Sequence, residues 1–472
     1  MESTRFPFLP SSLLLALLGA PGLQAQTVFQ PKKSLVLNTA SQKIGSKVFK
    51  GGIFVFNRVQ IDQGIRVHAE GPNPLILVSL GDLVVNGRLD GDGQNAPNVD
   101  TLNSANFPSP GGKPGPAGGA GGRGSPNSTG HSPGGEMGFG PFGILGLGGV
   151  GGLANTTGGI SGAGGGGGSF STKGDPYFPL RFDPKTLRNV QQIGFGGFGQ
   201  GRSKVLGGAP GSLLLFDRRK DNDFWGWAVD VHQKRLIHGE ILRPFGGSGG
   251  GGGGDRYYRP NFRLDEKGAG GGGGGGAVLV YALGKIIVGP KGQISANGGD
   301  GGGGEPGGSS QWGGAGGGGS GGMVILASRK GIDLHVHGGT YGEKDNSFSV
   351  SADGGVSGLG KTSSEPFSKK YAFPPSRSMA GNLGGLGGMG IVQFIVPVDG
   401  KNRDGTNTIL DDRVRILRNG KPLTGAQKQK YLAWRGFPNK KGVWVDDKGN
   451  PIRLGDQEGD IRPSPILMPL WF

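Results

Sequence analysis

Two oxygen-rich stretches of the sequence contain the residue types that bind calcium. Residues 90–95 read Asp-Gly-Asp-Gly-Gln-Asn, so Asp90 and Asp92 occupy the first and third positions of a calcium-binding loop. The sixth position is Asn95, where such a loop needs Gly, and the twelfth is Thr101, where it needs Glu. We therefore favour a turn at Asp90 and Asp92, with a weak calcium site as the alternative.

The second oxygen-rich stretch ends at Asp411 and Asp412. It starts at Asp399 and also holds Lys401 and Arg403, whose positive charges oppose a bound cation. A turn is again favoured, with calcium as the alternative. We expect no other cofactor, because the chain has no Cys and hence no thiolate ligand for zinc or an iron–sulfur cluster.

An aromatic pair is the third candidate for chemistry. In Phe224-Trp225-Gly226-Trp227, the two indoles would lie on one face of a strand, close to Asp221 and Asp223. Aromatic platforms beside carboxylates suit sugar binding, so Trp225 and Trp227 are candidate glycan-binding residues. The alternative is that Trp serves as a core anchor within its own charged insertion.

The sequence assigns no catalytic residue. Paired carboxylates for glycoside hydrolysis would have to come from Asp and Glu side chains on the repeat scaffold, and their spacing identifies no such pair. We therefore expect no enzymatic activity. A polysaccharide-active β-helix enzyme is kept as an alternative, since β-helix scaffolds do carry such sites.

The composition restricts the fold that could position these residues. Gly makes up 107 of the 472 residues, against about 7% in an average protein. Each Gly costs a helix interior about 1 kcal/mol relative to Ala, so a mostly helical protein is excluded. With 50 Lys and Arg against 34 Asp and Glu, the net charge is +16. This charge lies in small scattered clusters, so we expect no nucleic-acid partner and favour anionic cell-envelope polymers or polysaccharide as partners.

The first 25 residues have the pattern of a secretory signal peptide. Arg5 precedes a short apolar run over 11–20, and a Pro-Gly pair then leads to Ala25, after which cleavage is expected. The apolar run is too short to span a bilayer, and no later stretch is apolar enough to do so. We therefore predict a secreted or cell-envelope protein without a transmembrane segment.

The remaining chain divides by composition into three parts. Residues 26–110 form a β-rich repeat segment, and residues 111–396 form a glycine-rich repeat domain with a charged insertion at 217–244. Residues 397–472 form a basic, mostly-β C-terminal region. Short apolar runs separated by Gly, Asn and Asp predict strands and turns throughout.

A repeat unit joins a Gly tract, an apolar strand, a tight turn and a second strand that ends in Gly. Two clear copies start at Gly274 and Ser320, and weaker copies start at Leu75 and Gly388. The first strands, such as 277–283, lack polar alternation, which indicates burial on both faces. We predict an all-β fold, with a β-solenoid or a β-sandwich-like repeat scaffold.

The Gly tracts have two competing interpretations, flexible loops or bundled polyglycine II helices. Such a helix has three residues per turn and no internal hydrogen bonds, so every N–H and C=O group needs a partner on a neighbouring helix. Gly alone permits backbones to approach that closely on all sides. Because apolar strands bound the tracts within 249–322, we favour an ordered bundle of polyglycine II type there.

Gly270–Gly276 followed by Ala277-Val-Leu-Val-Tyr, and 316–322 followed by Met323-Val-Ile-Leu, carry a resemblance to known proteins. They resemble exported glycine-rich proteins of bacterial cell surfaces and, more loosely, the polyglycine-helix modules of phage tail adhesins and receptor ectodomains. This resemblance implies exposure and a structural role. The expected function is thus a structural or adhesive protein without catalytic activity, with a glycan-binding surface module as the first alternative.

Overall fold

The structure is a computed structural model, and strands dominate its regular elements. Apart from them, the named elements include one 3-10 turn, η1 (Pro141–Gly143). The residues that the structure describes are 28–99, 108–125, 134–145, 147–153, 162–170, 208–209, 211, 225, 227–230, 235–238, 243–256, 266–307, 311–336, 349–356, 384–397, 413–425, 428, 437–438, 444–445, 461–462 and 466–470.

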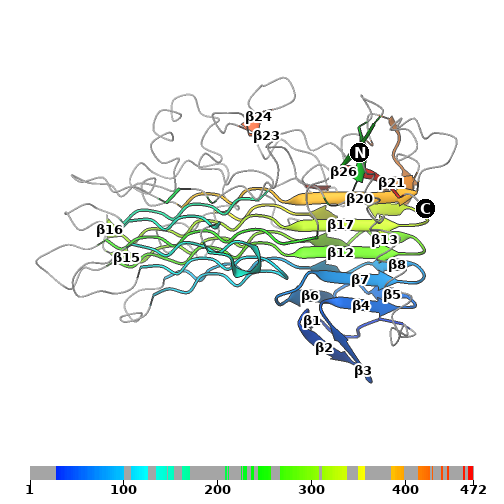
Figure 1. Ribbon diagram of the computed structural model, residues 1–472, viewed down its shortest axis with the longest axis horizontal. Coiled ribbons are helices and arrows are strands. Elements are labelled where there is room, and N and C mark those ends of the chain that lie inside the picture. The colour runs from blue at the N-terminus through cyan, green and yellow to red at the C-terminus, as the bar shows by residue number, and fades with distance from the viewer. Residues whose placement is uncertain are drawn as a thin grey trace, which may run out of the picture.

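Eighteen of the strands form three six-stranded sheets (Figure 1). Sheet A contains β4 (Ile53–Phe56), β7 (Leu75–Ser79), β12 (Ala277–Ala282), β17 (Met323–Ser328), β20 (Ile391–Pro397) and β26 (Ile466–Leu470). Sheet B contains β5 (Val59–Ile61), β8 (Leu83–Val85), β13 (Ile286–Val288), β18 (Ile332–His335), β21 (Val414–Arg418) and β22 (Lys421–Pro422). Sheet C contains β1 (Leu35–Asn38), β6 (Arg66–Glu70), β9 (Arg88–Asp90), β14 (Gln293–Ser295), β19 (Val350–Ser351) and β25 (Ile461–Arg462).

The other strands form short antiparallel pairs. They are β2 (Ser41–Ile44) with β3 (Lys47–Lys50), β10 (Trp227–Asp230) with β11 (Arg235–His238), β15 (Pro306–Gly307) with β16 (Gln311–Trp312), and β23 (Phe437–Pro438) with β24 (Trp444–Val445).

Successive strands of the chain visit sheets A, B and C in turn. Thus β7, β8 and β9 form one layer, β12, β13 and β14 the next, and β17, β18 and β19 the one after. Within each sheet these strands pair in parallel, for example Ile286 with Leu83 on one side and with Ile332 on the other. The predicted all-β class is confirmed, and the strand order follows the stacked layers of a solenoid rather than two packed sheets.

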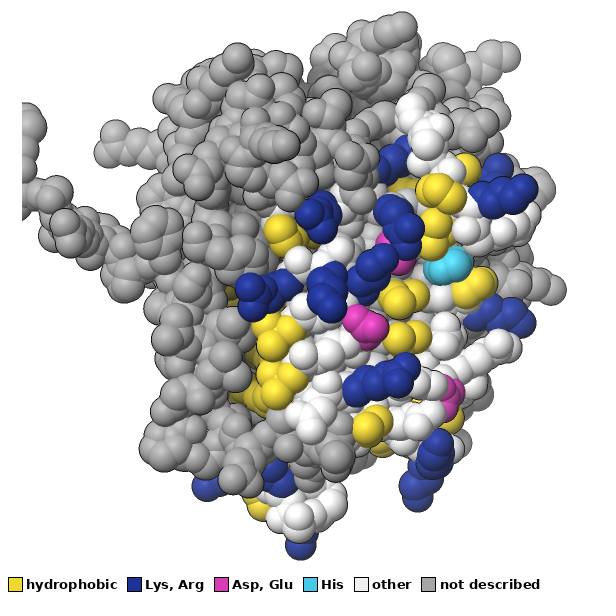
Figure 2. Space-filling view, turned by 90° about the vertical axis from the view of Figure 1, so that its right-hand side faces the viewer, with side chains coloured by type: hydrophobic (Ala, Val, Ile, Leu, Met, Phe, Trp, Pro, Cys, Tyr) yellow, Lys and Arg dark blue, Asp and Glu magenta, His cyan; other side chains and the backbone are white. Residues whose placement is uncertain are grey.

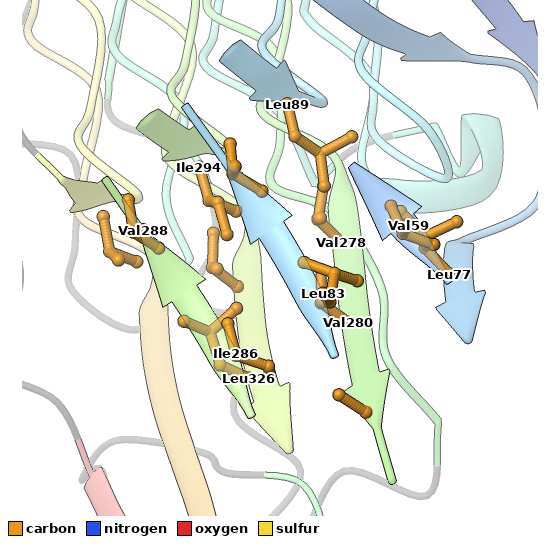
Figure 3. Close-up of a cluster of buried hydrophobic side chains, with 14 of the residues drawn as sticks. Val59, Leu77, Leu83, Leu89, Val278, Val280, Ile286, Val288, Ile294 and Leu326 are labelled. Atoms are coloured by element: carbon orange, nitrogen blue, oxygen red, sulfur yellow. The ribbon is translucent and has the colours of Figure 1, made fainter. Parts of the chain in front are cut away.

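The main hydrophobic core lies between the three sheets. Alternate residues of each strand point inward, such as Val278 of β12, Ile286 of β13 and Ile294 of β14, and all three are fully buried (Figure 3). Sheet A is buried on its other face as well, where Leu279, Ile325 and their neighbours form a second cluster. The absence of polar alternation in these strands therefore has the physical cause that the sequence indicated.

The Gly-rich stretches run from the end of a sheet C strand to the start of the next sheet A strand. They lie side by side as extended rows beside the sheets (Figure 1). We call them the Gly segments; the described ones are 91–99, 108–116, 117–125, 134–140, 147–153, 162–170, 243–256, 266–276, 296–305, 312–322, 352–356 and 384–390.

Segment 266–276 shows how these rows bind one another. The N–H groups of Ala269, Gly272 and Gly275 donate to the carbonyls of Gly314, Gly317 and Ser320, at 2.8–2.9 Å. The step of three residues on both partners is the repeat of a polyproline II-type helix. The intervening N–H groups donate to segments 91–99 and 117–125.

The carbonyls of the same segment accept hydrogen bonds from three further neighbours, 108–116, 243–256 and 296–305. Segment 266–276 is therefore surrounded on all sides by other Gly segments. The predicted polyglycine II bundle is confirmed here, and the flexible-loop alternative is wrong for these residues.

The requirement for Gly follows from these distances. A Cβ atom added to Gly270, Gly271 or Gly272 would lie 2.1, 2.2 or 1.9 Å from a carbonyl oxygen, each on a different neighbouring segment. Real Cβ atoms essentially never approach so closely, and a backbone carbonyl in a packed bundle has little room to move. No direction around the segment can therefore accept a side chain.

We predict that Gly273→Ala lowers the free energy of unfolding by at least about 3 kcal/mol, as overpacking of a rigid interior does. The new Cβ atom would lie 2.1 Å from the carbonyl oxygen of Lys113. Denaturant and thermal melts measure the effect. Gly51→Ala is the control, because its Cβ meets nothing within 4 Å and only its positive φ of 67° opposes the change, at about 1 kcal/mol. Equal losses in both variants would contradict close packing at Gly273.

Candidate functional site

The candidate site is a charged cluster on the outer face of sheet C, where β6 and β9 lie side by side. The register pairs Arg66 with Arg88 and His68 with Asp90. Since side chains alternate along a strand, Val67 points into the core while Arg66 and His68 point to the opposite face. Asp90 ends β9, immediately before the first Gly segment.

Asp90 is the centre of this cluster. Arg66 donates two hydrogen bonds to its carboxylate, from Nε at 2.7 Å and from a terminal nitrogen at 2.8 Å, and His68 Nδ1 lies 2.7 Å from Oδ1. Arg88 Nε adds a contact of 3.1 Å. Burial by itself raises the pKa of Asp90, but the hydrogen bonds from Arg66 and His68 outweigh it and hold that pKa well below its ordinary value.

Asp92 lies two residues further on, within segment 91–99. Its carboxylate accepts the backbone N–H of Asn297 at 2.7 Å and is paired with Arg88. Burial, together with the nearby charge of Asp90, raises the pKa of Asp92. Arg88 therefore lies between two carboxylates whose pKa values move in opposite directions.

Such a split in pKa occurs at acid–base catalytic pairs, but it does not make this cluster a catalytic site. The Asp90 side chain is fully buried, and protein groups already bind its oxygens. Asp92 likewise fixes the first turn of a Gly segment to the next one through Asn297. The arrangement is that of an ion-pair network which joins sheet C to the bundle.

The turn predicted at Asp90 and Asp92 is wrong, because the chain continues straight on as segment 91–99. The calcium alternative finds no support in this geometry, since arginines occupy the positions that a cation would need. Within the described residues, no group of three or more His, Asp or Glu side chains could hold a metal ion. Asp411 and Asp412 lie outside the described residues.

A row of Asp and Asn side chains continues outward from this cluster at every third residue. Its oxygens accept backbone N–H groups of segment 296–305: Asp92 from Asn297, Asn95 from Asp300, and Asn98 from Gly303, at 2.7–2.8 Å. The next layer repeats the pattern, as Asn297 and Asp300 accept from Asp353 and Val356 at 2.8 Å. The row replaces backbone acceptors on this partly exposed side of the bundle, where there is room for side chains.

The sequence analysis missed this row, although a signal was present. Asp92, Asn95 and Asn98 recur with the three-residue period of the helix, as do Asn297 and Asp300. An oxygen acceptor at every third position of a Gly tract thus marks the outer layer of a polyglycine bundle. In the first of these tracts the same oxygens were interpreted as the start of a calcium loop.

Trp225 lies in the second hydrophobic cluster, beside Phe170 and Phe245, and is 7% exposed. Its backbone N–H donates to the buried side chain of Gln393 at 3.1 Å, and its carbonyl accepts from the same side chain at 3.2 Å. This position agrees with the core-anchor alternative and leaves little surface on which a sugar ring could stack. Trp227 belongs to β10, and its side chain lies outside the described part of the structure.

Comparisons with known proteins add nothing to this geometry: no family model, no curated protein and no solved structure matches the chain. The resemblance to exported glycine-rich proteins therefore stays a prediction from composition and repeats. Any statement about function has to come from the residues and contacts described above.

We predict that Asp90→Asn lowers the free energy of unfolding by about 2–3 kcal/mol at pH 7, since it breaks a buried charge network. The lowered pKa of Asp90 means that its contribution is complete above the unfolded value, about 4, and is lost as the pH falls below it. Denaturant melts should therefore converge for variant and wild type towards pH 2. Glu136→Gln, which removes an exposed pair with Arg123, is the control and should cost less than about 1 kcal/mol.

The opposite pH dependence is predicted for Asp300, in which burial raises the pKa to about 6 although the side chain accepts the N–H of Val356. A raised pKa favours folding at low pH, and this stabilisation is lost as the pH rises from about 4 through 6. Asp300→Asn keeps the acceptor oxygen without the charge. It should raise the melting temperature by about 2–4 °C at pH 7.5 and leave it unchanged at pH 4.

The reverse change, Asn297→Asp, places a carboxylate at the equivalent position of the same row and should lower the melting temperature at pH 7.5. Stabilisation by both changes, or by neither at any pH, would contradict a cost of burying charge in this row.

Proposed function

We propose that this protein is an exported structural protein of a cell surface or extracellular matrix, which acts by adhesion or assembly and not by catalysis. One observation carries the proposal: the Gly segments bind one another through their backbones in every direction, as segment 266–276 does. A chain that commits so much of its length to such a bundle gains a fixed, extended body. Shape is what a scaffold or adhesin needs.

The charged groups of the described residues agree with this role. The densest cluster, around Asp90, is consumed by internal ion pairs, and Asp92 is bound to the neighbouring Gly segment. Neither is presented to a substrate. No observation favours the alternative of a polysaccharide-active enzyme, and the buried position of Trp225 weakens the alternative of a glycan-binding module.

Export is proposed from residues 1–25, which lie outside the described residues. Across the part of the chain that is described, no helix has the length and apolar character to cross a membrane. The net charge of +16 would favour association with anionic polymers of a cell envelope.

The full chain, expressed in a bacterium that exports proteins, should appear outside the cytoplasm with Gln26 as its first residue. N-terminal mass spectrometry and antibody labelling of intact cells measure this. Ala25→Arg, which places a large charged residue at the expected cleavage position, should leave residues 1–25 attached. A wild-type protein found only inside the cell with an intact N-terminus would overturn the proposed location and role.

A further inference from the structure

We infer that the turns between sheets A and B form a cationic ridge that binds an acidic polysaccharide. The ridge consists of Arg58, Lys285, Lys330 and Arg413. This inference rests on the proposed structural role and names the chemistry of its partner.

The stacked layers place these cations in a row. Arg58 directly precedes β5, Lys285 precedes β13, and Arg413 precedes β21, while Lys330 lies two residues before β18. The sheet B register pairs the first residues of these strands, Val59, Leu83, Ile286, Ile332 and Val414, from one layer to the next. Neighbouring strands lie about 4.8 Å apart, so the basic turns follow one another at that interval or its multiples.

The adjoining outer face of sheet B leaves this positive charge largely uncompensated. Asp333 is bound by Lys285 at 3.3 Å and by Arg415 at 2.6 Å, so two cations share one carboxylate. Asp82, in the turn before β8, donates its negative charge to the same row, and its side chain accepts the backbone N–H of Lys285. Figure 2 shows this end of the molecule, on which Lys and Arg side chains gather and Asp and Glu are sparse.

Apolar side chains beside the ridge favour a sugar polymer among anionic ligands. Val84 of β8 and Ile287 of β13 are paired in register, point away from the core and are only half-buried. They form an apolar strip next to Lys285, and Figure 2 shows yellow side chains between the basic ones. The C–H faces of sugar rings can pack on such a strip while carboxylates that recur along the polymer meet cations that recur along the layers.

The test is retention of the full mature protein on immobilised polygalacturonate, eluted with a NaCl gradient, with immobilised dextran as the neutral polymer. The ridge variant is Arg58→Glu with Lys330→Glu, both exposed. The matched control is Lys43→Glu with Lys50→Glu, which makes the same change in charge at exposed positions of the β2–β3 hairpin. Thermal melts establish that both variants are folded.

We expect the wild type and the hairpin control to bind polygalacturonate with affinities within about twofold of each other, and not to bind dextran. The ridge variant should bind at least about tenfold more weakly and elute at lower salt, as lost cation contacts require. Equal weakening of both variants would overturn the inference, since net charge alone would then explain binding. Unchanged binding of the ridge variant, or stronger wild-type retention on double-stranded DNA than on polygalacturonate, would also overturn it. A failure of export would leave these binding results unaffected, so the two proposals fail separately.

Discussion

The structure depends on one constraint: a polyglycine II helix makes no hydrogen bonds of its own, so neighbouring helices must supply every partner. Ordering each Gly residue costs roughly 1–2 kcal/mol or more of backbone entropy, which an isolated tract cannot recover. The bundle is therefore stable only when many tracts assemble in register. Once assembled, a single added methyl group inside segment 266–276 would meet a carbonyl oxygen.

The sheets establish that register. Segments 266–276 and 312–322 are hydrogen-bonded neighbours that continue directly into β12 and β17, which pair from Ala277 with Met323 onward. The backbone N–H of Met323 donates to the carbonyl of Gly276 at 2.9 Å, at the junction between bundle and sheet. The two types of structure thus share one continuous contact, and the buried apolar strands fix the ends of the Gly segments.

Polar groups complete the bundle where this continuity ends. At the far end of segments 243–256 and 266–276, the backbones of Arg256 and Glu266 bond to each other and their buried side chains form an ion pair of 2.7 Å. Beside sheet C, the Asp90 network holds the start of segment 91–99, and the row of Asp and Asn side chains then satisfies the N–H groups of the next layer. Charge in this part of the protein serves the framework, while the surplus of cations lies on the turns before sheet B.

Much of the fold could be predicted from the sequence, because its signals are local. Apolar runs without polar alternation, such as 277–283, require burial on two faces, and uninterrupted Gly tracts between them require partners on all sides. The neighbours of each tract could not be predicted, because Gly tracts are chemically alike and their register depends on distant strands. Trp225 shows the same limit, since its partner Gln393 lies 168 residues away. The Asp92 row was missed because its period becomes meaningful only once the adjacent segment is known.

Hydrogen exchange in peptides that cover residues 266–276 tests the central claim most directly. Gly amides in an unstructured chain exchange quickly, whereas each described N–H from Ala269 to Gly276, apart from that of Gly270, is bonded to a neighbouring segment. The account predicts protection in these peptides comparable to that of β12, which follows them in the chain. Exchange at the rate of an unstructured chain, with β12 still protected, would contradict an ordered bundle.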